Sequence, residues 1–472
     1  MIVKLVLVLS IAAAIRAAEV YYDRLGRFTD EPPYCGTLER PICRLPQDPR
    51  VINTQFFLFT RRNPDQYQVI SALSVSSVAG TNFEPDKNSI FIVHGAFEWG
   101  DKPWLVEMCQ AFLKVSDVNC FCVDWRGGSF ALYTQSSNNV RVVGAEIDSF
   151  LSFLQETYGY DMLKVYLIGH SLGAHVVGEA GRRKRGIRRA SGLDAAGPYF
   201  ENTPPEVRLD PTDAICVDAI HTDGPADEFH LGFGIQQTVG NVDHYVNGGK
   251  NNPGCEKITF LLENIDNIVE GVYETIFCNH HRSFMFFTES ISRPHDFIGY
   301  PSSSYEDFLE GSGFPCTEVS CAYMGYKADE YVLCRHDQDS TDNQKFFLNT
   351  GEPPNSPRWR YGISITITGS NLVLGSISVA LCGNECSSQH EIYSGPLSSG
   401  THSSFIDVEL DVNPVQMVKV SWHKSIISIF QSKLSASAVT VQYGPSGEMY
   451  EFCGGDPAEE DTSQILGKCS TL

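Results

Sequence analysis

The chain has 472 residues, with 57 acidic and 35 basic side chains and a formal net charge of −22 at pH 7. This length exceeds that of one ordinary hydrophobic core, so we expect two domains. The acidic balance argues against nucleic acid and against electrostatic docking on anionic membranes, because both partners are negatively charged.

The N-terminal residues 1–18 have the pattern of a secretory signal peptide. Lys4 precedes the apolar run Leu5–Ile15, and the small residues Ala17 and Ala18 follow it. The run is too short to span a bilayer, and no later stretch approaches about 18 uninterrupted apolar residues. We therefore expect a secreted, extracellular protein without a transmembrane anchor.

The 15 cysteines fit secretion, because disulfides persist in oxidising compartments. Closeness in the sequence suggests six disulfide pairs, although spacing alone proves no pairing. Three cysteines remain without a close partner, in agreement with the odd count: Cys122, Cys216 and Cys334. The suggested pairs are Cys35 with Cys43, Cys109 with Cys120, Cys255 with Cys278, Cys316 with Cys321, Cys382 with Cys386, and Cys453 with Cys469.

Strands and helices alternate through the first part of the chain, after a Pro- and Cys-rich lead-in at residues 19–48. Amphipathic periodicity predicts helices at Trp104–Leu113 and Val140–Tyr158. Short apolar runs predict strands at 54–60, 89–94, 118–124, 165–168 and 214–221, and a further strand that ends at 193–194. This alternation is typical of an α/β domain with a mainly parallel sheet, which we place at residues 19–352.

Ser171 lies at the centre of a G-x-S-x-G pentapeptide, Gly169–Gly173. The apolar run Val165–Ile168 precedes it, and the small-residue start of a helix, Ala174–Ala180, follows. Strand, sharp turn and helix form the context of a nucleophile elbow, where glycines permit close backbone packing. The pentapeptide alone is a weak signal that also fits a structural turn. With its flanking strand and helix, it predicts a nucleophilic serine.

A serine nucleophile needs a histidine to take its proton and a carboxylate to orient the imidazole. In the elbow fold, the chain order is serine, acid, histidine. Asp194, at the top of the next predicted strand, is the expected acid, and Asp223 is the alternative. Six histidines that follow in this domain are candidates, and the pattern does not choose among them: His221, His230, His244, His280, His281 and His295. For the oxyanion, one backbone N–H should come from Leu172 and the second from Ala96 or Phe97.

The composition changes near residue 350, where the segment 349–357 carries the Pro, Gly and Asn of a linker. Beyond it, Gly, Ser and Asn separate runs of alternating polarity. These runs predict strands at 359–368, 373–381, 415–422 and 437–443. We expect an all-β sandwich at residues 356–472.

Several motifs together make the chain resemble the pancreatic lipase family from about residue 19 to its end. They are 123–129 (VDWRGGS), 143–146 (VGAE), 169–175 (GHSLGAH), 178–181 (GEAG), 207–211 (VRLDP), 220–223 (IHTD), 232–234 (GFG) and 359–361 (WRY). The resemblance implies an α/β-hydrolase domain followed by a PLAT-like β-sandwich.

The resemblance also implies which residues are catalytic. The triad would be Ser171, Asp194 and His280, whereas His281 stands where the family usually has an aliphatic residue. The oxyanion donors would be Leu172 and Ala96, although the family usually has an aromatic residue at the position of Ala96. A poorly active branch of the family carries Val and Ala shortly after the acid. This chain has Ala196 and Pro198 there, as in the active branch.

Residues 205–213 match the family's structural calcium loop. Asp210 and Asp213 would provide carboxylate oxygens, and Pro205 and Arg208 would provide backbone carbonyl oxygens. Calcium prefers several such oxygens from one tight loop. Without the resemblance, an acidic surface loop would be the favoured interpretation.

Cys255 and Cys278 enclose a segment whose apolar residues recur at three- and four-residue spacing opposite acidic residues. This pattern predicts an amphipathic helix, which by itself would be interpreted as packed on the core. A disulfide-closed loop that ends two residues before His280 can instead cover the site and open on lipid. The resemblance accordingly implies a lid at residues 255–278.

Together these features predict a secreted serine lipase that hydrolyses triacylglycerol at a lipid–water interface. The long lid favours triacylglycerol over phospholipid. A phospholipase A1 or galactolipase on the same scaffold is the alternative enzyme, and a catalytically silent lipid-binding relative is the alternative from another class. The resemblance leaves colipase open as a protein partner of the β-sandwich.

Overall fold

The fold is that of a computed structural model. The structure describes residues 18–225, 232–255, 277–317, 320–331, 334, 344–369, 373–424, 434–454 and 462–469. Residues 1–17 of the predicted signal peptide and residues 256–276, the interior of the predicted lid, lie outside these ranges. No helix within the described ranges is long and apolar enough to cross a membrane.

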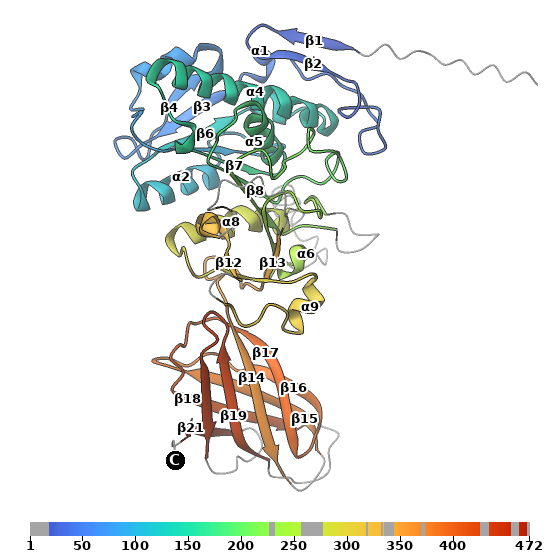
Figure 1. The fold of residues 1–472 in the computed structure, drawn as a ribbon, viewed down its shortest axis with the longest axis vertical. Helices are drawn as coiled ribbons and strands as arrows, with labels where there is room; N and C mark the ends of the chain where they lie inside the picture. Colours follow the sequence, from blue (N-terminus) through green and yellow to red (C-terminus); the bar gives the residue numbers. More distant parts are fainter. Residues whose placement is uncertain are drawn as a thin grey trace, which may run out of the picture.

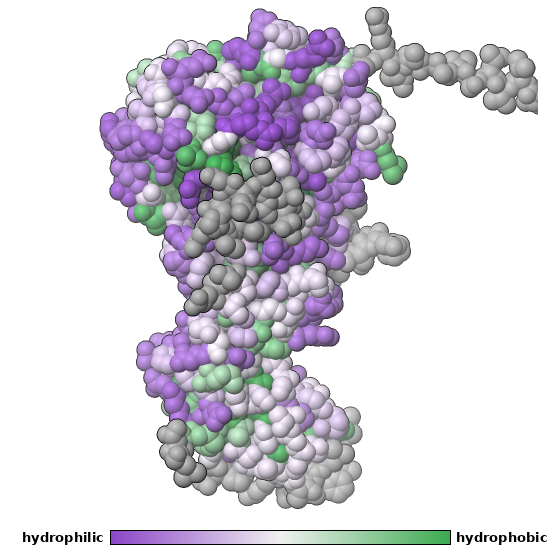
Figure 2. Space-filling view, in the orientation of Figure 1, coloured by the Kyte–Doolittle hydropathy of each residue, from purple (hydrophilic) through white to green (hydrophobic). Residues whose placement is uncertain are grey.

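An α/β body and an all-β body lie end to end, with the all-β body at the bottom of Figure 1. This arrangement confirms the predicted fold class. In the space-filling view, the surface of the α/β body is mainly hydrophilic, whereas the all-β body is paler with small hydrophobic patches (Figure 2).

The α/β body is built on one sheet with the strand order β12-β11-β13-β10-β9-β8-β7-β5-β6-β3-β4. Its strands are β3 (Gln55–Phe59), β4 (Gln68–Ser71), β5 (Ser89–Val93), β6 (Asn119–Asp124), β7 (Val165–His170), β8 (Arg189–Leu193), β9 (Cys216–His221), β10 (Val242–Val246), β11 (Ile298–Pro301), β12 (Ala322–Tyr323) and β13 (Gln344–Leu348). The central block of adjacent strands, β13-β10-β9-β8-β7-β5-β6, is parallel. Antiparallel strands extend the sheet at both edges. A small hairpin precedes the sheet: β1 (Glu19–Tyr22) and β2 (Gly26–Thr29).

Helices cover both faces of this sheet, as its fully buried central strands require. On β5, Phe91 and Val93 join the core that contains α4 and α5, whereas Ile90 and Ile92 join the core that contains α2 and α8. The helices are α1 (Pro49–Ile52), α2 (Pro103–Val115), α3 (Arg126–Ser129), α4 (Tyr133–Tyr158), α5 (Leu172–Arg183), α6 (Asn247–Lys250), α8 (Cys278–Ser292) and α9 (Tyr305–Leu309), with 3-10 turns η1 (Ala72–Gly80), η2 (Met162–Lys164) and η4 (Gly325–Glu330).

Helix α4 begins seven residues before the predicted start at Val140. Its first turns carry polar residues that are buried and bonded within the helix. Ser137 Oγ donates to the Tyr133 carbonyl at 2.7 Å, and Asn138 Nδ2 donates to the Thr134 carbonyl at 2.8 Å. Apolar periodicity does not detect such a start, because the buried face here is polar.

The all-β body is an eight-stranded antiparallel arrangement with the order β16-β15-β18-β21-β20-β19-β14-β17. Four of its strands match the predicted runs: β14 (Trp359–Thr368), β15 (Val373–Cys382), β18 (Met417–Lys424) and β19 (Ser435–Tyr443). Four others were not predicted from the sequence: β16 (His390–Leu397), β17 (Gly400–Val408), β20 (Met449–Cys453) and β21 (Ser463–Lys468). Gly, Pro and Ser interrupt the alternation of β16 and β17, so their pattern is weak.

Seven disulfides cross-link the described residues, and six of them join the pairs that sequence proximity suggests. These six join Cys35 to Cys43, Cys109 to Cys120, Cys255 to Cys278, Cys316 to Cys321, Cys382 to Cys386, and Cys453 to Cys469. The seventh joins Cys216 on β9 to Cys334 across a sequence separation of 118 residues, which proximity cannot reveal. This pair was therefore not predicted from the sequence, where both cysteines remained without a close partner. Cys122 on β6 is the free cysteine of the described ranges, and it is buried.

Candidate active site

Ser171 lies on the sharp turn between β7 and α5. Its backbone has φ 56° and ψ −122°, a region that non-glycine residues rarely adopt. The turn has no room for side chains at its two glycines. A Cβ on Gly169 would lie 2.1 Å from the Gly173 carbonyl oxygen, and a Cβ on Gly173 would lie 2.2 Å from the Val93 carbonyl oxygen. The geometry is therefore that of a nucleophile elbow.

Asp194 follows β8 and is directly bonded to His280 in the first turn of α8. His280 Nδ1 lies 2.5 Å from Asp194 Oδ2. The second carboxylate oxygen accepts the backbone N–H groups of Thr222 at 2.7 Å and Asp223 at 3.0 Å. The carboxylate is fully buried, so these bonds fix its orientation toward the imidazole.

Ser171 and His280 line the same cavity, which has a volume of about 300 Å³. Most of its other lining is apolar, with Ala96, Phe97, Tyr133, Ala196, Pro198, Phe233 and Phe277 among its walls. The two residues that match the active branch, Ala196 and Pro198, thus lie at the cavity itself. The arrangement provides an apolar chamber with a serine and an oriented histidine at its wall.

The loop after β5 runs along this cavity. The Phe97 N–H donates to the Ser129 carbonyl at 3.1 Å and is therefore occupied. Among the described residues, we find no acceptor for the Ala96 N–H. Leu172 is the first residue of α5, where backbone N–H groups have no partner inside the helix. Ala96 and Leu172 therefore remain the candidate oxyanion donors.

Asp223 is a second carboxylic acid next to the Asp194–His280 pair. Single ligand atoms of Asp194, Asp223 and His280 all lie within 4.8 Å of one another. Burial and the neighbouring Asp194 raise the pKa of Asp223 to about 7, although His280 opposes this rise. Such a group of three could hold a metal ion, but the direct bond between Asp194 and His280 favours proton transfer chemistry.

The other candidate histidines have different partners. His221 Nε2 bonds Asp243 at 2.8 Å, and His244 Nε2 lies 3.4 Å from the Ala322 carbonyl oxygen. Burial lowers the pKa of His281 to about 3, so this side chain is neutral at physiological pH. His295 is exposed near Glu330, and His230 lies outside the described residues.

The predicted calcium loop brings two buried carboxylates close together. Asp213 Oδ2 accepts the Asp210 N–H at 2.9 Å, and Asp210 Oδ1 accepts from Thr212 N at 3.1 Å. Burial raises the pKa of Asp213 well above its ordinary value. Arg208 Nη1 lies 3.6 Å from Asp210 Oδ2. Two buried carboxylates in one loop cost free energy that a bound cation would lower, and their oxygens suit calcium, so the residues present fit the ion.

Glu98 is a site residue that the sequence analysis missed. It lines the same cavity as Ser171, and its side chain is 2% exposed. A single glutamate between Phe97 and Trp99 belongs to no motif, so its position gives no signal of a role. Only the fold brings it next to His170 and the backbone of Gly95 in the loop after β5.

Comparison with known proteins extends over both bodies. The Lipase family model matches residues 18–355, and the PLAT/LH2 domain model matches residues 361–466. Pancreatic lipase-related protein 2 of Myocastor coypus is 44% identical over 465 residues, which cover 98% of each chain. Human pancreatic triacylglycerol lipase is 44% identical over 460 residues, or 97% of each chain. The human protein named inactive pancreatic lipase-related protein 1 is 43% identical over 464 residues, or 98% of each chain. This chain therefore belongs to the pancreatic lipase family and carries a Lipase domain followed by a PLAT domain.

Proposed function

We propose that this protein is a secreted serine lipase that hydrolyses triacylglycerol at a lipid–water interface. The observation that carries the proposal is the 2.5 Å bond between His280 and Asp194, with His280 and Ser171 at the wall of one apolar cavity. An oriented imidazole beside a serine in an apolar chamber suits ester bonds of long hydrocarbon chains.

Catalysis would proceed through an acyl-enzyme. His280 Nε2 takes the Ser171 hydroxyl proton as Oγ bonds to the ester carbonyl carbon. The N–H groups of Ala96 and Leu172 stabilise the resulting oxyanion. His280 then gives its proton to the glycerol oxygen as the ester C–O bond breaks. A water molecule, deprotonated by His280, next attacks the acyl carbon, and the fatty acid leaves while Ser171 regains its proton. Asp194 keeps the imidazole oriented throughout.

Access to the site supports a lipid substrate. The disulfide between Cys255 and Cys278 closes the segment that we propose as the lid, and Phe277 at its end lines the cavity. Phe97 lines the cavity and is 43% exposed, and its ring centroid lies 6.4 Å from that of Phe130, which is 55% exposed. Exposed apolar side chains beside an active site suit contact with lipid.

We further propose that calcium is a structural ion of the loop 205–213. Asp210 and Asp213 would hold it through their carboxylates, and Pro205 and Arg208 through their backbone carbonyls. Bound there, the ion would neutralise the buried carboxylates. The loop packs directly on α5, since a Cβ on Gly181 would lie 2.1 Å from the Asp213 carbonyl oxygen. Colipase is the protein partner we propose for the PLAT domain.

The experiment compares the secreted protein with its Ser171→Ala variant on emulsified triacylglycerol and on phospholipid and galactolipid, with and without bile salt and colipase. Ser76→Ala, at an exposed serine in η1, is the matched control. We expect Ser171-dependent fatty acid release that is fastest on triacylglycerol. Release from phospholipid or galactolipid alone would favour the alternative enzyme. No Ser171-dependent release on any lipid would favour a catalytically silent relative. One relative that is 43% identical to this chain is named inactive.

A further inference from the structure

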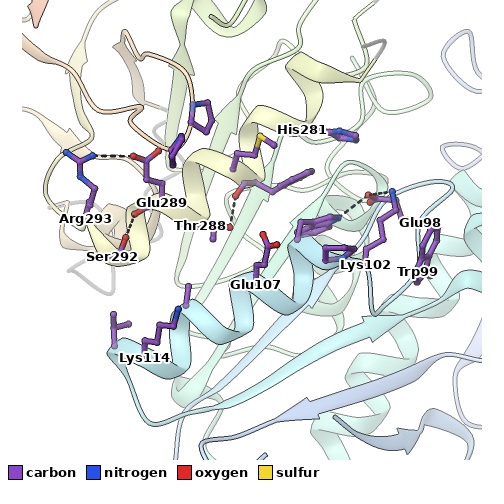
Figure 3. A pocket seen from close by; sticks show the side chains of 18 residues that line it. Glu98, Trp99, Lys102, Glu107, Lys114, His281, Thr288, Glu289, Ser292 and Arg293 are labelled. Carbon is purple, nitrogen blue, oxygen red and sulfur yellow. Dashed lines mark hydrogen bonds and ion pairs between the residues drawn. The ribbon is translucent and has the colours of Figure 1, made fainter. Parts of the chain in front are cut away.

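The Glu98 carboxylate lies at one end of the groove between α2 and α8, opposite the end with Lys114 and Arg293 (Figure 3). Each of its oxygens accepts a hydrogen bond from a neutral donor. Oε2 accepts the Gly95 backbone N–H at 3.0 Å, and Oε1 accepts the Trp104 indole N–H at 3.0 Å. A buried carboxylate is retained at such a place only when its partners compensate the loss of hydration.

Two further groups face the same carboxylate. His170 Nδ1 lies 3.4 Å from Oε2, and Lys102 Nζ lies 3.8 Å from Oε1. Burial alone would raise the pKa of Glu98, but the hydrogen bond and charge of His170, together with the charges of His94 and Lys102, hold the pKa well below its ordinary value. Glu98 is therefore ionised at neutral pH.

The loop that Glu98 binds has a strained backbone. Phe97 has φ 57°, in the left-handed region that bulky residues rarely adopt. Hydrogen bonds hold the loop on both sides of this residue. The Phe97 N–H donates to the Ser129 carbonyl at 3.1 Å, and Ser129 Oγ donates to the Glu98 carbonyl at 2.8 Å. Strain of this kind persists only where surrounding contacts fix it, and it concentrates at functional sites.

The same loop packs on the nucleophile. A Cβ on Gly95 would lie 2.6 Å from Ser171 Cβ and 3.1 Å from Ser171 Oγ. His170, the residue before the nucleophile, has its ring centroid 4.5 Å from that of His280. The Glu98 carboxylate thus contacts Gly95 in this loop, His170 before the elbow, and Trp104 in α2.

We propose that Glu98 is a positioning residue whose carboxylate holds Gly95–Phe97 against Ser171, so that the Ala96 N–H faces the developing oxyanion. The role rests on the proposed hydrolase function. Both oxygens are required, because Gly95 and Trp104 each donate to a different one. A glutamine offers one acceptor oxygen, and its amide N–H₂ would face a donor on the other side.

The test measures kcat and KM of the full secreted protein on a monomeric ester, p-nitrophenyl butyrate, which removes interface binding from the readout. Glu98→Gln should lower kcat on the order of 10- to 100-fold with KM changed less than about twofold, because the oxyanion donor shifts while ground-state contacts remain. Glu98→Asp keeps two acceptor oxygens and should retain more of kcat. Glu107→Gln, at an exposed glutamate in the same groove, is the matched control and should leave both constants unchanged.

Hydrogen–deuterium exchange provides a readout that does not need activity. The Gly95 and Phe97 amides, which are hydrogen-bonded in wild type, should exchange at least about tenfold faster in Glu98→Gln. If Glu98→Gln does not fold, Ser129→Ala, which removes the anchor on the Glu98 carbonyl, should show the same two changes to a smaller degree.

Unchanged kcat in a folded Glu98→Gln, or a lower kcat without faster exchange of this loop, would overturn the proposal. If Glu98→Gln does not fold, an unchanged Ser129→Ala would also overturn it. If wild type lacks Ser171-dependent activity, the proposed function fails, and the exchange comparison still decides whether Glu98 holds the loop.

Discussion

Asp223 lies beside Asp194 at the buried end of the site, and both carboxylates approach His280. Asp194 is bonded to the imidazole and to two backbone N–H groups. Asp223 Oδ2 accepts the Phe233 N–H at 3.2 Å. Asp223 therefore has the less compensated carboxylate, and the pKa near 7 follows from its burial and from the neighbouring negative charge.

This relationship predicts a pH-dependent stability cost. A carboxyl whose folded pKa lies above its unfolded pKa favours the protonated fold, so its stabilising contribution is present at low pH. That contribution is lost as the pH rises from about 4 through 7, because the unfolded chain ionises first. The difference from an ordinary aspartate corresponds to at most about 4 kcal/mol.

Asp223→Asn should therefore gain stability relative to wild type as the pH rises from 5 to 8. Thermal unfolding of both proteins across this range measures the difference in Tm, with Asp86→Asn, at an exposed aspartate, as the control. A difference in Tm that does not vary with pH would contradict the buried-acid explanation.

Asp194→Asn should remove the charge that orients and stabilises the His280 imidazolium. We expect kcat to fall on the order of 10³- to 10⁴-fold with little change in KM, as when the acid of a triad is neutralised. Steady-state kinetics on a monomeric ester measure the two constants. A loss below about tenfold would show that Asp194 is not the acid of this site.

Gly173→Ala should destabilise the fold and remove the elbow. Its Cβ would meet the Val93 carbonyl oxygen at 2.2 Å, so β5 and α5 would have to separate. Overpacking of this kind costs about 1–3 kcal/mol. Gly80→Ala is the control, because a Cβ there meets no atom within 4 Å. Urea unfolding compares the variants, and equal midpoints for Gly173→Ala and wild type would contradict the close packing at the elbow.

Calcium removal should lower the stability of wild type. An ion present at 100 times its Kd stabilises the fold by about 2.7 kcal/mol, and a chelator should abolish this contribution. Unfolding with calcium and with chelator measures it, and Asp213→Asn should make the two curves coincide. Coinciding curves for wild type itself would exclude a stabilising calcium ion.

Most of the candidate site could be predicted from the sequence because its parts are local in the chain. The elbow around Ser171 follows from three adjacent segments, and Asp194 from the end of the next strand. The sequence pattern could not choose His280 among the six candidate histidines, because that choice depends on where α8 begins relative to Asp194. The resemblance to a family supplied it, and the 2.5 Å bond now places the two residues together.

Other features depend on contacts between distant segments, which local patterns do not encode. The disulfide between Cys216 and Cys334 joins residues 118 positions apart. Glu98 has no motif, and its role emerges only because α2 and the elbow converge on its carboxylate. Helix α4 begins with buried polar residues, so its first turns carry no apolar periodicity. In each case, tertiary packing rather than propensity decides the outcome.

Covalent trapping of the nucleophile tests the central claim most directly. The secreted protein is incubated with an alkyl phosphonate ester, and the modified residue is identified by peptide mass spectrometry. We predict stoichiometric modification of Ser171, which is abolished in Ser171→Ala and slowed in His280→Ala and Asp194→Asn. Modification of another residue, or none in wild-type protein that is folded, would contradict the account.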